Sequence, residues 1–272
     1  MGPLNDQQTR EKGFLIYPVY SRRSRGLSVG INLFPDDKLC SFDCPYCEVF
    51  PFQAACSFSL PLMETALAET LDNVKAQGIE VRDICFSGNG EPVMSPHFAA
   101  ALESAFRIRD RAAPEAELVL ISNAGGLLEE ETFELLHRAA AKERGLRIWL
   151  KLDAATPQWY ALMNRSSIPH APLIEKIRAF VKCTPLTLQT MLCAIDGSPP
   201  PPEEERAWEK LVLELAASAA EIREVQIYGK ARPAPEDPLA AALPNAYLDA
   251  RAASLKSALA AAGRDVPVGV YY

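Results

Sequence analysis

The chain has 272 residues, of which 49% are hydrophobic and 23% charged, and this composition is ordinary for a globular protein with a sizeable core. Its formal net charge is −7, so a general nucleic-acid-binding surface is not expected and only a local basic patch could serve that purpose. Residues 1–12 are polar and charged, unlike a signal peptide, and no apolar run approaches the length of a membrane span. The seven cysteines are therefore expected in a reducing, cytoplasmic compartment, where metal binding is expected rather than disulfide formation.

The hydrophobic pattern predicts six strand–helix units. Strands are expected at residues 27–33, 83–86, 117–121, 147–153, 186–193 and 224–229. Helices are expected at 61–77, 95–111, 129–144, 173–182, 202–219 and 244–262, with a helical turn at 156–165 and a strand or extended tail at 266–272. Residues 1–13 are expected to form a flexible tail, 14–233 the main domain, and 234–272 a helix and tail packed on it. This alternation favours an α/β fold with a parallel sheet.

Three cysteines, Cys40, Cys44 and Cys47, lie within eight residues directly after the first predicted strand, with the spacing C-x3-C-x2-C. Spacing this tight on one loop lets the three sulfurs converge on one centre. Three cysteines can hold a [4Fe–4S] cluster and leave one iron open to an outside ligand. A structural zinc site normally has four ligands, and here the fourth would come from a distant residue. A zinc knuckle and three unrelated thiols are the alternatives.

Polar residues also follow the next two predicted strands. The second strand ends in Ser87 and a Gly-Asn-Gly-Glu-Pro segment at 88–92, and the third ends in Ser122-Asn123-Ala124-Gly125. Glycines let the main chain approach a ligand closely, and the carboxylate of Glu91 suits an ammonium partner. Both segments also have a plainer interpretation, as turns that join a strand to the next element.

The cysteine triad, with the aromatic Tyr46 before its last member, resembles the signature of the radical S-adenosylmethionine (SAM) enzymes. Residues 88–92 resemble the Gly-Gly-Glu-Pro segment of that superfamily, with Asn89 where the motif has glycine. The resemblance covers roughly residues 17–233. It implies a single-domain partial (β/α)6 barrel, a [4Fe–4S] cluster held by the three cysteines, and SAM on the open iron. The reduced cluster would cleave SAM, and the resulting 5′-deoxyadenosyl radical would abstract hydrogen from a substrate.

The same resemblance implies SAM contacts at successive strand ends, while no catalytic residue is assigned. Tyr46 would pack beside the adenine, residues 87–91 would hold the amino group, and the others would border the ribose, carboxylate or substrate. For Lys151 and Asp153, a structural ion pair is the alternative. The predicted cofactor contacts are Tyr46, Ser87, Gly88, Asn89, Gly90, Glu91, Ser122, Asn123, Lys151, Asp153 and Gln189.

Other segments, such as 151–155 and 188–192, resemble a branch of Fe–S oxidoreductases related to the wybutosine tRNA-modification enzymes. The substrate class stays open between a small molecule, a peptide and RNA, and an electron donor such as a flavodoxin or ferredoxin is implied. A wybutosine-type tRNA-modifying enzyme and a non-catalytic Fe–S or metal-binding protein are the alternative functions. Arg22 and Arg23 either hold a carboxylate or phosphate of SAM or substrate or lie in a solvated basic turn. Arg232 is either a substrate-side anchor or part of a solvated turn. No site role is assigned to Cys56, Cys85, Cys183 and Cys193.

Overall fold

A computed structural model describes residues 15–49, 51–141, 144–232 and 239–272. The tail predicted at 1–13 lies outside the described residues, and the predicted domain boundaries stay predictions. The chain divides into two compact units, which are described separately. Unit 1 comprises Met1–Cys40, Pro51–Ser122 and Lys142–Arg147, and unit 2 comprises Ser41–Phe50, Asn123–Ala141 and Ile148–Tyr272.

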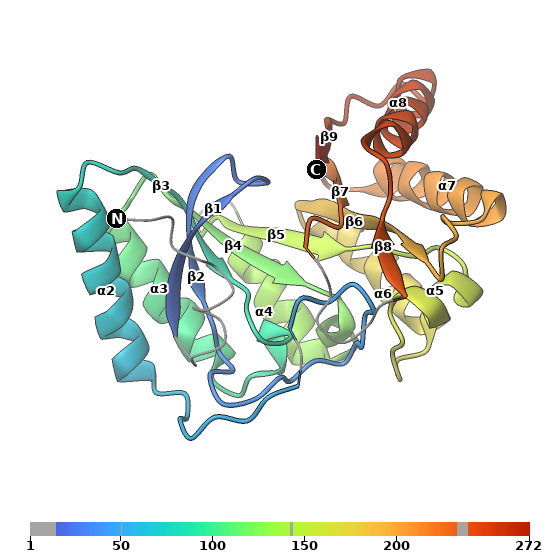
Figure 1. Cartoon of the computed structure of the whole chain (residues 1–272). Helices are drawn as coiled ribbons and strands as arrows, with labels where there is room; N and C mark the ends of the chain where they lie inside the picture. The colour runs from blue at the N-terminus through green and yellow to red at the C-terminus, as the bar shows by residue number, and fades with distance from the viewer. Residues whose placement is uncertain (1–14, 50, 142–143, 233–238) are drawn as a thin grey trace. The chain divides into compact units, whose positions relative to one another are not determined.

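In unit 1, a sheet carries two long helices on one face (Figure 1). Strands β1 (Ile16–Ser21) and β2 (Gly26–Ile31) form an antiparallel hairpin, and β3 (Val81–Phe86) and β4 (Glu117–Ser122) continue the sheet in parallel. The helices are α2 (Leu60–Ala76) and α3 (Phe98–Ala112), with the short helix η1 (Pro92–Met94) before α3. Helix α2 buries Met63, Leu67, Leu71 and Val74, which recur at helical spacing and so form one apolar stripe.

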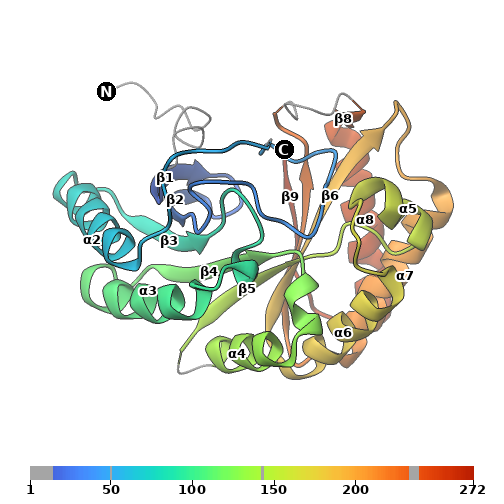
Figure 2. The same cartoon turned by 90° about the horizontal axis from the view of Figure 1, so that it is seen from below.

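Unit 2 continues the alternation of strands and helices. Its strands β5, β6, β7 and β9 are parallel neighbours, and the short β8 pairs antiparallel with β6. Figure 2 shows α6, α7 and α8 side by side along these strands. Every residue of β6 is buried, as expected for a central strand covered on both faces. The elements are α4 (Glu130–Ala140), β5 (Leu146–Lys151), α5 (Pro157–Met163), α6 (His170–Cys183), β6 (Leu186–Ile195), α7 (Pro202–Ser218), β7 (Ile222–Gly229), β8 (Ala240–Ala242), α8 (Asn245–Ala261) and β9 (Val268–Tyr271), with the short helix η2 (Gly125–Leu128) before α4.

The predicted α/β fold class, a partial barrel of six strand–helix units, is confirmed, since all six predicted strands are present as β2 to β7. Two strands, β1 and β8, were not predicted. Strand β1 contains Pro18, which weakens a strand signal but is tolerated at a sheet edge. Strand β8 is three alanines long and exists only through its pairing with β6. No helix in the described ranges has the length and apolarity needed to cross a bilayer.

Candidate cofactor site

In unit 1, the loop after β3 lies against the residue that precedes the first cysteine. Gly90 forms an isolated parallel bridge with Leu39, and the Glu91 N–H donates to the Leu39 carbonyl at 2.8 Å. A Cβ on Gly90 would lie 1.9 Å from that carbonyl oxygen. Glycine is therefore required at position 90 by a close backbone approach. The two motifs singled out in the sequence meet at this contact, one residue before Cys40.

Two asparagines, Asn32 and Asn89, form hydrogen bonds that hold the loop after β3 in place. Asn32 Oδ1 accepts hydrogen bonds from the N–H groups of Phe34 at 3.1 Å and Asn89 at 3.2 Å, while Asn89 Nδ2 donates to the Phe34 carbonyl at 3.0 Å. Gly88 has a φ of +121°, which favours glycine. Asn89 thus has a structural role in place of the family's glycine, and its contact with SAM stays a prediction. Asn32 was not among the predicted site residues, because the sequence predicted a strand over 27–33, whereas β2 ends at Ile31 and Asn32 begins the turn.

Glu91 and Ser122 come from neighbouring strand ends and touch each other. The Ser122 hydroxyl donates to Glu91 Oε1 at 2.8 Å, and both residues are only 3% exposed. A carboxylate at this depth is costly unless it has polar or cationic partners. Ser87 is engaged differently, because its hydroxyl lies 2.6 Å from the Tyr17 hydroxyl. The structure therefore brings Glu91 and Ser122 together, while their contact with SAM stays a prediction.

In unit 2, the loop that begins at Ser41 is anchored to the segment after α5. The Asp43 N–H donates to the Asn164 carbonyl at 3.0 Å, and the Ser166 hydroxyl donates to the Ser41 carbonyl at 2.8 Å. Asn123 Nδ2 donates to the Ser41 hydroxyl oxygen at 3.1 Å. Asn123, a predicted SAM contact, therefore holds the cysteine loop. Asn164 and Ser166 were not singled out in the sequence, because nothing in their local pattern marks a contact with a loop 120 residues earlier.

Cys40, Cys44 and Cys47 form no disulfide within the described residues and are of intermediate burial. The Cys47 N–H donates to the Cys44 carbonyl at 2.9 Å, and Asn164 Nδ2 lies 3.8 Å from Cys44 Sγ. Within the described residues, no three His, Cys, Asp or Glu groups are gathered closely enough to hold a metal. Three cysteine sulfurs are a donor set that suits an iron–sulfur cluster, so the chemistry of these residues fits that group. Their assignment as ligands stays a prediction.

Asp153, two residues past β5, is the centre of a buried network in unit 2. Its carboxylate accepts hydrogen bonds from the Tyr46 hydroxyl at 2.5 Å, the Met191 N–H at 2.9 Å and Asn164 Nδ2 at 3.2 Å, and Lys151 Nζ lies 3.1 Å away. The Asp153 side chain has no solvent exposure. A buried carboxylate is costly unless hydrogen-bond donors surround it. Asp153 therefore positions Tyr46 and Lys151, two other predicted contacts.

Lys151 is held as a charged ammonium. Its Nζ lies 2.5 Å from the Tyr228 hydroxyl and 4.8 Å from the centre of the Tyr46 ring, a cation–π geometry. Burial alone lowers the pKa of Lys151, but Asp153, Tyr228 and Cys44 together outweigh it and the pKa is raised. The pKa of the Tyr46 phenol is raised well above its ordinary value, first by burial and then by Asp153. Tyr46 is therefore a neutral donor to the carboxylate.

A small pocket in unit 2 collects three of the predicted contacts, Asn123, Lys151 and Asp153. The other residues that line it are Phe42, Leu152, Ala154, Tyr160, Asn164, Leu173, Ile174 and Ile177. Gln189 does not line this pocket. Its side chain is fully buried, and its Nε2 donates to Gln226 Oε1 at 2.6 Å. Contact between Gln189 and a cofactor stays a prediction.

Comparison with known proteins gives a likeness in sequence and a broader likeness in fold. No family model matches the chain. A protein of Helicobacter pylori strain J99, described as a UPF0026 protein, is 31% identical over 88 residues, which are 32% of this chain and 28% of that protein. The chain thus matches little more than a quarter of that relative's length.

Several solved structures of similar fold are radical SAM enzymes. SuiB from Streptococcus suis, bound to S-adenosylmethionine, has a TM-score of 0.65 at 13% identity, covering 86% of this chain and 48% of SuiB. A radical SAM methyltransferase from Sphaerobacter thermophilus has a TM-score of 0.63 at 15% identity, and the match covers 90% of this chain and 66% of the methyltransferase. The chain has the radical SAM fold. It spans about half the length of SuiB.

An archaeal TYW1, a wybutosine enzyme, shares the radical SAM fold with a TM-score of 0.50 at 10% identity, covering 85% of this chain and 71% of TYW1. The resemblance to the wybutosine-related branch is thereby confirmed at the level of the fold. At these identities the likeness concerns architecture. The roles of individual residues rest on the geometry described above.

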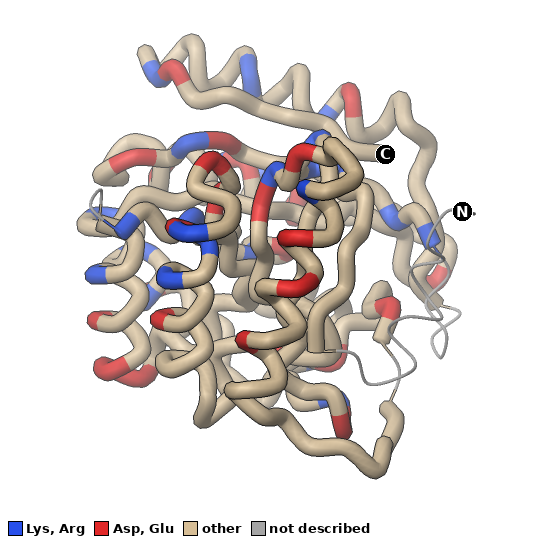
Figure 3. The backbone as a smooth tube through the Cα atoms, turned by 90° about the vertical axis from the view of Figure 1, so that its left-hand side faces the viewer, with Lys and Arg blue, Asp and Glu red and all other residues tan. Residues whose placement is uncertain are grey.

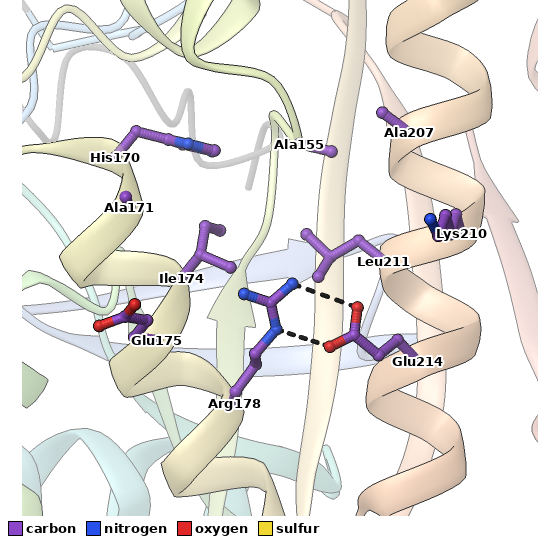
Figure 4. Close-up of a pocket in the computed structure, with 10 residues that line it drawn as sticks. All are labelled: Ala155, His170, Ala171, Ile174, Glu175, Arg178, Ala207, Lys210, Leu211 and Glu214. Atoms are coloured by element: carbon purple, nitrogen blue, oxygen red, sulfur yellow. Dashed lines mark hydrogen bonds and ion pairs between the residues drawn. The ribbon is translucent and has the colours of Figure 1, made fainter.

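A second pocket of unit 2 lies between α6 and α7 and is also lined by Ala155 (Figure 4). Arg178 and Glu214 form a bidentate ion pair across it, with distances of 2.7 and 3.1 Å. His170 Nε2 is buried there without a hydrogen-bond partner in the described part of the chain, and burial lowers the pKa of His170. None of the predicted cofactor contacts lines this pocket.

Several residues without an assigned role now have positions in the radical SAM fold. Arg232 pairs with Glu48 at 3.2 Å, one residue after Cys47, so it is tied to the cysteine loop rather than lying in a solvated turn. Cys193 is buried, and burial, followed by Asp153, raises its pKa to about 12. Cys85 is likewise buried, while Cys56 and Cys183 are exposed.

Proposed function

We propose that the chain is a radical SAM enzyme in which Cys40, Cys44 and Cys47 hold a [4Fe–4S] cluster whose open iron binds SAM. The bound cofactors would supply reductive cleavage of SAM to a 5′-deoxyadenosyl radical, which abstracts hydrogen from a substrate. The observation that carries the proposal is the backbone contact of Gly90 and Glu91 with Leu39. That contact joins the glycine-rich loop to the first cysteine, and a simple electron carrier has no need of it.

The chain's own residues would bind and orient SAM. Glu91, with Ser122 beside it, suits the SAM ammonium, and the glycines of the same loop allow the main chain to approach closely. Tyr46 is held rigid by Asp153 and offers its ring to the adenine. The protein's part is thus orientation and exclusion of water, while the cofactors supply the chemistry.

Three substrate classes fit this proposal: a small molecule, a peptide and RNA. SuiB has been solved with its precursor peptide SuiA, and TYW1 is a wybutosine enzyme. In Figure 3, acidic and basic positions are interspersed along the helices that face the viewer. Such mixed charge gives little sequence-independent attraction for RNA on this face. A flavodoxin or ferredoxin is proposed as the electron donor.

The test is anaerobic reconstitution of the full chain with iron and sulfide, followed by reduction with dithionite in the presence of SAM. The expected result is a brown protein that binds SAM and releases 5′-deoxyadenosine and methionine. Cys44→Ala should lose the chromophore, while the matched variant Cys183→Ala, at an exposed thiol on α6, should keep it. A reduced cluster that neither binds nor cleaves SAM, or zinc in its place, would overturn the proposal.

A further inference from the structure

On the basis of the proposed function, we propose that Asn164 is a positioning residue that donates a hydrogen bond to the sulfur of Cys44 and raises the reduction potential of the cluster. Asn164 is only 2% exposed, and its Nδ2 lies 3.8 Å from Cys44 Sγ, within reach for the large sulfur atom. Its main-chain carbonyl accepts the Asp43 N–H at 3.0 Å. One residue therefore holds the cysteine loop by its backbone and the cysteine itself by its side chain.

The orientation of the Asn164 amide follows from its surroundings. Asn164 Nδ2 also lies 3.2 Å from Asp153 Oδ2. An ionised carboxylate only accepts hydrogen bonds, so the NH₂ side of the amide must face Asp153. A reversed amide would place two oxygens against each other in a buried site. Because the NH₂ group carries two hydrogens, one can serve Asp153 while the other points to Cys44.

The position of Asn164 is set by a short helix that is held at both ends. Thr156 caps the N-terminus of α5 by accepting the Trp159 N–H at 3.2 Å, and the Asn164 N–H donates to the Tyr160 carbonyl at 2.9 Å at the other end. The buried carboxylate of Glu204 accepts the Ala155 N–H at 2.6 Å and the Thr156 N–H at 2.9 Å. These contacts keep the donor in place whether or not the cysteine carries a cluster.

The chemical consequence follows from charge. Reduction adds negative charge to a cluster and its thiolates, so a hydrogen bond to a ligand sulfur stabilises the reduced form more than the oxidised form. The effect is largest where water is excluded, as it is around Asn164. Loss of this hydrogen bond should therefore make the cluster harder to reduce.

The test is a potentiometric titration of the reconstituted full chain, followed by electron paramagnetic resonance of the reduced cluster. In Asn164→Ala and Asn164→Leu, the ratio of reduced to oxidised cluster at a fixed potential should fall about threefold to tenfold, where tenfold equals about 59 mV for one electron. The leucine variant keeps the side-chain volume, so it gives the same readout if the alanine variant does not fold.

A matched control separates the sulfur contact from the anchoring of the loop. Ser166→Ala removes a hydroxyl that donates to the Ser41 carbonyl at 2.8 Å and so holds the same loop. This variant should keep the wild-type potential. An unchanged potential in the Asn164 variants, or an equal shift in Ser166→Ala, overturns the inference while the proposed function stands. A wild-type protein that takes up no cluster overturns both.

Discussion

The stretches on either side of the bond between Cys40 and Ser41 are held by different kinds of interaction. Before it, in unit 1, the contact is main chain to main chain, from Leu39 to Gly90 and Glu91. After it, in unit 2, one main-chain hydrogen bond from Asp43 to Asn164 is joined by a network of polar side chains around Asp153. The backbone contact requires that position 90 has no side chain, so any substitution there disturbs the whole contact. The network around Asp153 can instead lose one hydrogen bond at a time. The two stretches should therefore respond differently to substitution.

The largest effect is expected in unit 2 when the buried charge is removed. Asp153→Ala leaves the Lys151 ammonium without its carboxylate and should lower the free energy of unfolding by about 3–5 kcal/mol. Urea denaturation followed by circular dichroism measures this. Arg178→Ala, which breaks a largely exposed ion pair with Glu214, is the matched control and should cost about 1 kcal/mol or less. Equal costs for the two variants would contradict the importance given to the network.

The next effect tests the backbone contact of unit 1. Gly90→Ala would place a methyl group 1.9 Å from the Leu39 carbonyl oxygen, so the loop must move, at a cost of about 1–3 kcal/mol. Cluster content and SAM affinity should fall together, as measured by iron analysis and equilibrium binding. Gly78→Ala is the control, because position 78 has a positive φ but open space around it. That variant should lose some stability and keep both cofactors.

A smaller effect should separate SAM binding from cluster binding. Glu91→Gln keeps the shape of the side chain but removes the charge proposed to meet the SAM ammonium, so SAM should bind about tenfold more weakly, or about 1.4 kcal/mol. Iron and sulfide content should not change. Glu64→Gln, on α2 of the same unit, should leave SAM affinity as it is. Loss of iron in Glu91→Gln would show that Glu91 supports the cluster rather than SAM.

The smallest effect is a pH dependence within unit 1. Burial raises the pKa of Asp83 from its usual value of 3.8, against the opposing effect of hydrogen bonds such as that from Ser28. The folded state binds the proton of the Asp83 carboxyl more tightly than the unfolded state does. The stabilisation that results is full below pH 3.8 and is lost as the pH rises through the pKa of Asp83 in the folded state. Urea denaturation should show Asp83→Asn gaining stability relative to wild type as pH rises from about 4 to 7. A constant difference would contradict the raised pKa.

Sequence reasoning placed six strands correctly because each carries a strong local pattern of β-formers and is followed by a helix. It missed β1 and β8, whose residues have weak strand signals and depend on a partner strand. For the candidate site, it singled out Glu91, Ser122, Lys151 and Asp153, since polar residues at successive strand ends stand out in a sequence, and their contact with a cofactor stays a prediction. Asn32 and Asn164 were not predicted as site residues, because the residues that they contact lie far away in the chain.

The sequence by itself determined the α/β architecture, the spacing of the three cysteines and the glycine-rich loop, because each is a pattern of neighbouring residues. Only the tertiary structure decided what these residues touch. It showed that Gly90 is required by the Leu39 carbonyl, and that Asp153 gathers donors from Tyr46, Asn164 and Met191. The reason is physical: hydrogen bonds between residues distant in the chain depend on how the strands and helices pack, and no local pattern records that packing.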